Sequence, residues 1–194
     1  MGLGVFQEKG LQRKIFPLML IWMSLIFAYF LISFQMKYLD PAHIYSLSVW
    51  TSITEIIGKL SAGSITLAIG LRPMFFLSFG VAITGIFFLA IFDPNTTSST
   101  NITIFMLLAR FGASMAVSGA NIAIIMLMPT KVVGSANGVC TFVASIMALF
   151  APIIAEMPLP WPMITLECFM VMSAIAVLFL SEDSPDSEGT ADNF

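Results

Sequence analysis

Long apolar stretches separated by short polar ones constrain this chain more than any other feature of its sequence. A helix needs about 20 mostly apolar residues to cross the hydrocarbon core of a bilayer, whereas the strands of a membrane barrel alternate over only about ten. Six continuous stretches near the longer length cover residues 15–34, 44–69, 74–92, 102–128, 132–155 and 161–180. We therefore expect an all-α, polytopic membrane protein, a bundle of six membrane-spanning helices.

Composition excludes the common alternatives. Hydrophobic residues make up 58% of the 194 residues and charged residues only 10%, where a soluble domain carries about 25% charged residues. Four of the 19 charged side chains fall in residues 1–14 and five in residues 182–194, which leaves ten for the region between. With a mean hydropathy of +0.97, the chain is not expected to be a soluble enzyme, a disulfide scaffold or a disordered protein.

The distribution of charge predicts the organisation of the chain and its orientation. We expect a basic cytoplasmic segment over residues 1–14, a six-span domain over residues 15–180 and an acidic cytoplasmic tail over residues 181–194. Cytoplasmic loops of membrane proteins are enriched in Lys and Arg. With both termini in the cytoplasm, only Lys37 is outside, and the inner basic residues are Lys9, Arg13, Lys14, Arg72 and Lys131.

Four charged residues are predicted inside spans, namely Glu55, Lys59, Arg110 and Glu167. Glu167 lies about a turn and a half into the last span and is expected to reach outward to the membrane surface, so the other three are the ones expected in the interior. Glu55 lies about 16 Å into its span and Arg110 about 12 Å into its own, at about 1.5 Å of rise per residue. Lys59 follows Glu55 by four residues, so the two side chains share a helix face. Such groups usually face a bundle interior or a water-filled cavity. They can line a polar cavity for a solute or proton. Alternatively, they neutralise one another or bond to backbone carbonyls and hold the helices in register.

Small and hydroxyl side chains inside the spans have simpler expected roles. Glycines let helix backbones approach closely in membrane bundles, and hydroxyls in helices commonly bond to the backbone of their own helix. The glycines expected to pack closely are Gly63, Gly80, Gly85, Gly112, Gly119 and Gly138. Side chains that can add neutral polar contacts are Ser24, Ser61, Ser118, Asn121 and Ser145.

The sequence offers no set of residues for catalysis. His43 is the single histidine and lies in a predicted outer loop without a second His or Cys nearby, so neither a metal site nor a histidine-based triad is expected. Cys140 and Cys168 lie in apolar runs and are expected to be small buried side chains. We expect no cofactor, no enzymatic activity and no nucleic-acid partner.

Several short motifs occur in an order that resembles a known carrier family. They are Tyr29-Phe30-Leu31-Ile32-Ser33-Phe34-Gln35, the acidic Glu55, Gly70-Leu71-Arg72-Pro73, the basic Arg110, Pro129-Thr130, Gly138-Val139-Cys140, Ala151-Pro152 and Glu182. Their order and spacing resemble the carboxyl-terminal six helices of the organic cation and anion transporter branch of the major facilitator superfamily. The resemblance covers nearly the whole chain and implies a six-helix bundle like one half of a major facilitator fold.

The resemblance also implies roles for individual residues. The rings of Tyr29 and Phe30 would face a small organic solute, Glu55 and Arg110 would supply charge, and Ser145 would give a neutral contact. A gating or structural role is implied for Lys59, Gly70, Arg72, Pro129, Lys131, Gly138 and Pro152. Family carriers place the solute between two six-helix halves near the bilayer midplane and rock one half against the other.

The sequence departs from the family pattern in the cytoplasmic gate network, where the family carries charged residues. The corresponding positions hold uncharged residues in this sequence, namely Leu67, Ala68, Leu71, Met126 and Val133. Two functions therefore remain open: transport as the carboxyl-terminal half of a secondary transporter, or a non-transporting membrane scaffold or assembly subunit derived from such a half.

The expected partners follow from the same resemblance. They are the lipid bilayer, a small organic solute and a second six-helix half, supplied by the same polypeptide, a separate chain or a homodimer. The plasma membrane is the expected location.

Overall fold

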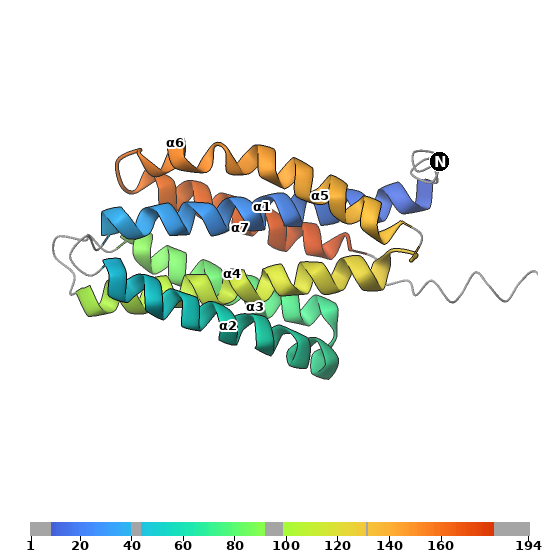
Figure 1. The fold of residues 1–194 in the computed structure, drawn as a ribbon, viewed down its shortest axis with the longest axis horizontal. Helices are drawn as coiled ribbons and strands as arrows, with labels where there is room; N and C mark the ends of the chain where they lie inside the picture. The colour runs from blue at the N-terminus through green and yellow to red at the C-terminus, as the bar shows by residue number, and fades with distance from the viewer. Residues whose placement is uncertain (1–8, 40–43, 92–98, 131, 181–194) are drawn as a thin grey trace, which may run out of the picture.

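The computed structural model describes residues 9–39, 44–91, 99–130 and 132–180, and all of its regular secondary structure is helical. The elements, shown in Figure 1, are α1 (Lys9–Leu39), α2 (Ile44–Ile69), α3 (Leu71–Ile91), α4 (Ser99–Leu127), α5 (Val133–Ala148), α6 (Ala151–Ala155) and α7 (Trp161–Leu178). Within these residues, six spans are long and apolar enough to cross a membrane, with α5 and α6 counted together as one. The prediction of six apolar spans is confirmed.

The fifth span is not the continuous helix that the apolar pattern predicted. α5 ends at Ala148, two turn residues follow, and α6 begins at Ala151. Pro152 explains the break, because proline has no backbone N–H and its ring clashes with the carbonyl four residues earlier, here that of Ala148. The proline is instead accommodated in the first turn of α6, where its missing N–H has no helical acceptor.

The connection between the second and third spans is also shorter than predicted. The predicted spans leave residues 70–73 as the connection, but only Gly70 is outside a helix, and α3 begins at Leu71. Gly70 has a φ of 89°, a left-handed conformation that glycine adopts without strain. Its N–H donates to the carbonyl of Thr66 at 2.9 Å, which closes the end of α2.

The helices form a bundle in which α1 and α4 are the most enclosed. α1 packs against α4, α5 and α7, while α4 also packs against α2 and α3. In the most apolar stretches of α1 and α4, 61% and 56% of residues are buried, against 17% for α2 and 22% for the span of α5 and α6. The beginning of α1 and the end of α7 lie at the same end of the bundle (Figure 1). The membrane side of that end stays a prediction.

Small residues let α3 and α4 cross closely. A Cβ on Gly85 would lie 2.6 Å from the nitrogen of Ala109, and one on Gly112 would lie 2.5 Å from the nitrogen of Ala82. Gly119 packs against the side chain of Met74. The predicted close packing is therefore confirmed at Gly85, Gly112 and Gly119. It is wrong at three positions whose added Cβ would meet nothing within 4 Å, namely Gly63, Gly80 and Gly138.

Polar side chains fasten helices that lie far apart in the sequence. The indole N–H of Trp22 in α1 donates to Thr141 Oγ1 in α5 at 3.2 Å. The buried Gln35 donates to the carbonyl of Ala155 at the end of α6 at 3.1 Å. Arg72, in the first turn of α3, donates from Nε to the carbonyl of Leu180 at 2.8 Å, and its Nη2 bonds the same oxygen. These bonds connect α1 to the fifth span and α3 to the end of α7.

Candidate functional site

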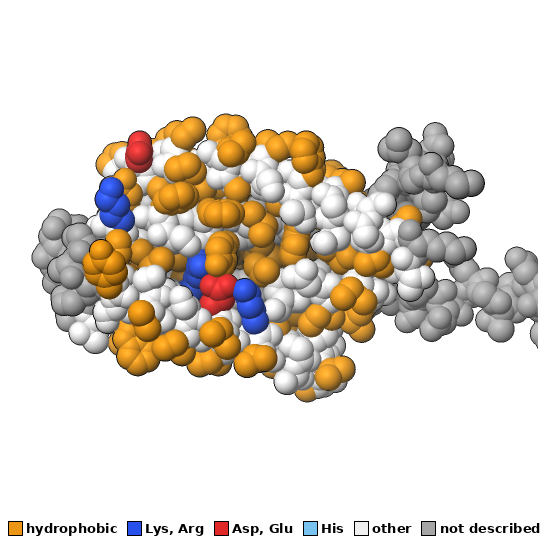
Figure 2. Space-filling model, in the orientation of Figure 1, with side chains coloured by type: hydrophobic (Ala, Val, Ile, Leu, Met, Phe, Trp, Pro, Cys, Tyr) orange, Lys and Arg blue, Asp and Glu red, His pale blue; other side chains and the backbone are white. Residues whose placement is uncertain are grey.

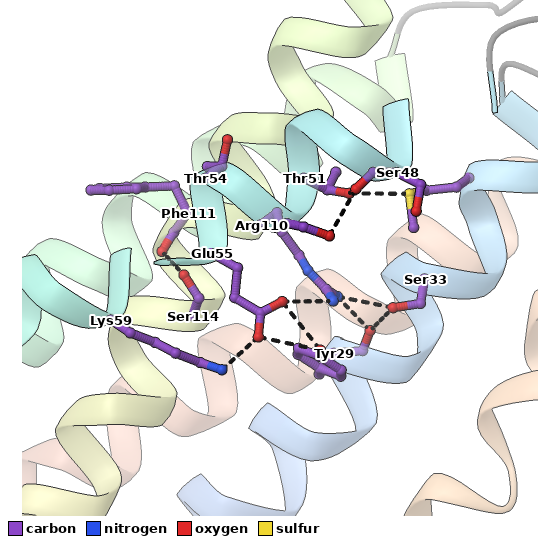
Figure 3. A network of polar contacts seen from close by, with 12 residues as sticks. Tyr29, Ser33, Ser48, Thr51, Thr54, Glu55, Lys59, Arg110, Phe111 and Ser114 are labelled. Atoms are coloured by element: carbon purple, nitrogen blue, oxygen red, sulfur yellow. Dashed lines mark hydrogen bonds and ion pairs between the residues drawn. The ribbon is translucent and has the colours of Figure 1, made fainter. Parts of the chain in front are cut away.

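A cluster of charged and polar side chains joins α1, α2 and α4 (Figure 3). Glu55 Oε1 accepts a bond from Lys59 Nζ at 2.5 Å, and Glu55 Oε2 accepts one from Arg110 Nη2 at 3.3 Å. The hydroxyl of Tyr29 lies 3.3 Å from Oε1 and 3.2 Å from Oε2 and donates to the carboxylate. Both oxygens of Glu55 are thus occupied within the chain.

Arg110 is held mainly by α1. Its Nη1 donates to the carbonyl of Tyr29 at 2.8 Å and to Ser33 Oγ at 3.0 Å. The guanidinium carbon also lies 3.7 Å from the centroid of the Tyr29 ring, within the range of a cation–π interaction. The Arg110 side chain is only 6% exposed. Among the described residues, its buried Nε has no hydrogen-bond partner.

The local sequence explains how these residues meet. Glu55 and Lys59 are four residues apart on α2, and Tyr29 and Ser33 are four residues apart on α1, so each pair lies on one helix face. Gly58 brings α2 close to α4, because a Cβ there would lie 3.0 Å from the carbonyl oxygen of Phe111. Phe111 follows Arg110 directly. The glycine therefore sets the distance across which Glu55 reaches the guanidinium.

The exposed fraction of the charged side chains increases from Arg110 on α4 to Lys59 on α2. The side chain of Arg110 is nearly enclosed, that of Glu55 is 15% exposed and that of Lys59 is 47% exposed. In the space-filling view, basic and acidic side chains meet near the centre of one face of the bundle (Figure 2). Glu55 is about 16 Å from the beginning of α2, and Lys59 about 15 Å from its end, at about 1.5 Å per residue. The charges thus reach a surface near the middle of the span.

Neutral polar residues extend this surface along two helices. Exposed residues spaced by three or four positions share one side of their helix. On α2 the group is the exposed Ser48, Ser52 and Lys59 together with the partly buried Glu55, and on α5 it is the exposed Asn137, Thr141 and Ser145. Both groups are turned toward α1, since Glu55 bonds Tyr29 and Thr141 bonds Trp22. We call these seven residues the polar face.

The cluster unites four of the predicted site residues, Tyr29, Glu55, Lys59 and Arg110. Phe30 lies beside it, with its ring edge-on to Tyr29 at 5.8 Å between centroids, and is 42% exposed. Ser145 is not part of the cluster. It lies exposed on α5, and its hydroxyl donates to the carbonyl of Thr141 in its own helix.

The residues with an implied gating or structural role occupy separate positions. Gly70 forms the turn between α2 and α3, and Arg72 bonds the end of α7. Pro129 is exposed after α4, and its carbonyl accepts bonds from the N–H groups of residues 132 and 133. Gly138 is exposed on α5, and Pro152 begins α6. Lys131 lies outside the described residues, as do His43, residues 1–8 and the acidic tail.

The hydroxyls expected to bond within their own helix do so at several places. Ser24 donates to the carbonyl of Leu20, and Ser61 to that of Gly58. The amide of Asn121 similarly donates to the carbonyl of Val117. These groups are therefore satisfied locally and do not extend the charged cluster.

Sequence reasoning missed two residues of the site. Ser33 was quoted only as part of a motif, although its spacing of four from Tyr29 placed it on the same helix face. Gly58 was not among the glycines expected to pack closely, yet it determines the approach of α2 to α4. Gly58 lies three residues after Glu55 and so shares its helix face, which was the signal in the sequence that could have identified it.

No group of three or more His, Cys, Asp and Glu side chains that could hold a metal ion occurs in the described part of the chain. Cys140 is buried and Cys168 is exposed, so the expected burial holds for one cysteine and is wrong for the other.

The chain matches no protein-family model, and a comparison with curated proteins finds no match either. The resemblance to the carrier family thus depends on the short motifs given above. What stands independently, in the described residues, is an all-helical arrangement with six spans suited to a membrane and a charged cluster that joins α1, α2 and α4.

Proposed function

We propose that this chain transports a small organic solute across a membrane as the carboxyl-terminal half of a secondary transporter, with a fold like half of a major facilitator carrier. The solute would bind between the polar face and a second six-helix half. Alternating access would follow from rocking the two halves against each other.

The polar face is the observation that carries this proposal. An ionisable side chain at mid-span is costly in contact with lipid and is normally directed toward protein or water. Lys59 is nevertheless 47% exposed, on a surface that also carries Glu55 and several hydroxyls. α2 and α5, which form its edges, are the least buried of the long helices. A surface with these properties suits a water-filled cavity closed by another protein unit.

Water access to the polar face can be measured with single cysteines. In a background lacking Cys140 and Cys168, Ser52→Cys on the polar face should react with a membrane-impermeant thiol reagent in lipid nanodiscs. Val171→Cys is the matched control, because Val171 is also exposed and lies near the middle of α7, away from this face. Equal reaction at both positions, or at neither, would contradict a water-filled cavity on this face.

Transport itself requires reconstitution. Liposomes containing the chain together with an amino-terminal six-helix half should show saturable uptake of organic ions. Replacing Glu55 and Arg110 together by Gln should abolish this uptake. Glu167→Gln removes a carboxylate from α7, outside the cluster, and should leave it unchanged. Uptake that persists without Glu55 and Arg110 would refute the assignment of the site.

One observation favours the alternative, a non-transporting membrane scaffold. Arg110 is almost fully enclosed and bonded to its own chain, as expected of a charge that holds α1, α2 and α4 in register. A scaffold should co-purify in a stable complex and show no change of melting temperature with any organic solute. A transporter half should instead be stabilised by its solute.

A further inference from the structure

The charges of the cluster do not balance. Two cations, Lys59 and Arg110, contact one carboxylate, Glu55, which leaves an excess of one positive charge. Among the described residues, no second carboxylate forms an ion pair with either cation. Ionisable groups within membrane spans normally pair with one another, because an uncompensated charge in a low dielectric is strongly unfavourable. One negative charge next to the cluster would complete it.

Lys59 is the cation that is able to receive a further carboxylate. Its ammonium group has three N–H donors, and one of them bonds Glu55 Oε1. Its side chain is 47% exposed, whereas that of Arg110 is 6% exposed and already bonds α1 at Tyr29 and Ser33. A carboxylate arriving from outside the bundle therefore reaches Lys59 without displacing any contact of Arg110.

The surface of α2 around Lys59 has the form of a helix-packing face. α2 packs mainly on α4, and only 17% of its most apolar stretch is buried. Gly63 lies one turn after Lys59 on the same side of α2, and a Cβ there would meet nothing within 4 Å. Leu67, another turn further on, is 90% exposed. Glycine lets a second helix backbone approach closely, so this row combines an ammonium group, a point of close approach and apolar surface.

The depth of Lys59 argues against a lipid headgroup as the source of the negative charge. By helical rise, Lys59 is about 22 Å from the beginning of α2 and about 15 Å from its end. The hydrocarbon core of a bilayer is about 30 Å thick, so this ammonium group lies well inside it. A carboxylate carried by another membrane-spanning helix can be presented at that depth.

A second copy of this chain also fits less well. Two copies that meet through the same face would bring together two excess positive charges, and like charges repel. The carboxylate of Glu167 on α7 lies about 9 Å from the beginning of its helix, against about 22 Å for Lys59 on α2. Both helices begin at the same end of the bundle (Figure 1), so in two copies inserted alike these groups lie at different depths.

We propose that the surface of α2 around Lys59 binds a membrane-spanning helix of the second unit that carries an aspartate or glutamate near its middle. The carboxylate of that helix bonds Lys59 and neutralises the cluster, while its backbone approaches α2 at Gly63. This inference rests on the part of the proposed function in which another protein unit covers the polar face. It specifies the chemistry of that unit, whether the unit completes a carrier or a scaffold.

Synthetic single-span peptides test the requirement for a carboxylate. The peptides consist of Leu and Ala, are long enough to cross the bilayer, and carry Glu, Gln or Lys at their central position. The full chain in phosphatidylcholine liposomes carries a donor dye and each peptide an acceptor dye, so that energy transfer reports binding. The Glu peptide should bind about tenfold or more tightly than the Gln and Lys peptides. Equal binding of the Glu and Gln peptides would overturn the proposal.

Substitutions on α2 locate the contact. Lys59→Gln should reduce the preference for the Glu peptide to about twofold or less, whereas Lys59→Arg keeps the charge and should retain it. Gly63→Leu should weaken binding of the Glu peptide by about threefold or more, because it blocks the close approach. Gly80→Leu on α3 is the matched control, since Gly80 is equally open, and it should have no effect. A preference that survives Lys59→Gln would refute the role of Lys59.

Two further measurements identify other occupants of this surface. Addition of phosphatidylglycerol to the liposomes should leave binding of the Glu peptide unchanged. Loss of binding would assign Lys59 to a lipid phosphate and overturn the proposal. Energy transfer between differently labelled copies of the chain, present without peptide and lost in Lys59→Gln, would assign the surface to a second copy and overturn it likewise.

The uptake assay separates this inference from the proposed function. Saturable uptake with an amino-terminal half, together with no preference for the Glu peptide, would overturn the inference and leave transport standing. A preference for the Glu peptide that depends on Lys59, together with no uptake, would support the inference and contradict transport.

Discussion

The guanidinium group of Arg110 lies over the ring of Tyr29, 3.7 Å from its centroid, while the backbone carbonyl of Tyr29 accepts a hydrogen bond from the same group. Tyr29 of α1 thus contacts the charged group of Arg110 in two ways, through its ring and through its backbone carbonyl. The carbonyl contact depends on the backbone alone. The contribution of the ring and that of its hydroxyl can be separated by substitution.

Tyr29→Phe should cost less stability than Tyr29→Leu. The phenylalanine ring keeps the cation–π contact and loses only the hydroxyl bonds to Glu55, an expected loss of about 1 kcal/mol. Leucine loses the contact as well, which adds about 1–2 kcal/mol for a desolvated pair. Reversible unfolding in mixed micelles measures both. Equal losses for the two variants would show that the ring contributes nothing to holding Arg110.

Ser33→Ala should destabilise the protein by about 1 kcal/mol, because Nη1 of Arg110 then keeps only the carbonyl of Tyr29 as an acceptor. Ser24→Ala is the matched control on the same helix. Its hydroxyl is buried more deeply than that of Ser33 but bonds only the carbonyl of Leu20, so its removal should change stability by a few tenths of a kcal/mol at most. A larger loss at Ser24 than at Ser33 would contradict the importance of the Arg110 contact.

Gly112→Ala and Gly85→Ala should each lower stability by about 1–3 kcal/mol, as expected when a methyl group is forced into a close-packed contact. The added Cβ atoms would lie 2.5 Å and 2.6 Å from backbone nitrogens of the facing helix. Gly80→Ala, on α3 five residues before Gly85, meets no neighbour within 4 Å and should be neutral or slightly stabilising. Thermal unfolding of the three variants side by side tests the α3–α4 crossing, and a neutral Gly112→Ala would argue against it.

Arg72→Met should loosen the end of α7, because Leu180 loses the bonds that its carbonyl accepts from Nε and Nη2 of Arg72. We expect a local loss of about 1–2 kcal/mol. Hydrogen exchange of the amides in the last turn of α7 should become faster. Lys37→Met removes a cation that lies exposed against the Tyr38 ring at 5.7 Å, and it should not affect α7. Unchanged exchange in Arg72→Met would contradict the anchoring role.

The sequence was sufficient to predict the spans and the pair on α2. Apolar length determines a membrane helix, and a spacing of four residues places Glu55 beside Lys59 in any straight helix. Both signals are local, so they do not depend on how the helices pack. The break before Pro152 was also local in origin, but the apolar character of the surrounding residues concealed it.

Contacts between helices could not be predicted in the same way. The union of Arg110 with Tyr29, Ser33 and Glu55 depends on which faces of α1, α2 and α4 meet, and spans that are apolar on most sides give little indication of this. The same holds for glycines. Gly85 packs against a neighbour whereas Gly80 does not, although both lie inside the same apolar helix.

The position of Arg110 in the sequence has a consequence for biosynthesis. A ribosome makes residues in chain order, so Tyr29, Ser33 and Glu55 are all synthesised before Arg110. Glu55 enters the membrane before Arg110 does, on the same helix as Lys59, and the two residues form a neutral pair. When α4 follows, its arginine meets a carbonyl, a hydroxyl, a ring and a carboxylate that have already been made. The most deeply buried charge of the cluster is therefore made after every group that receives it.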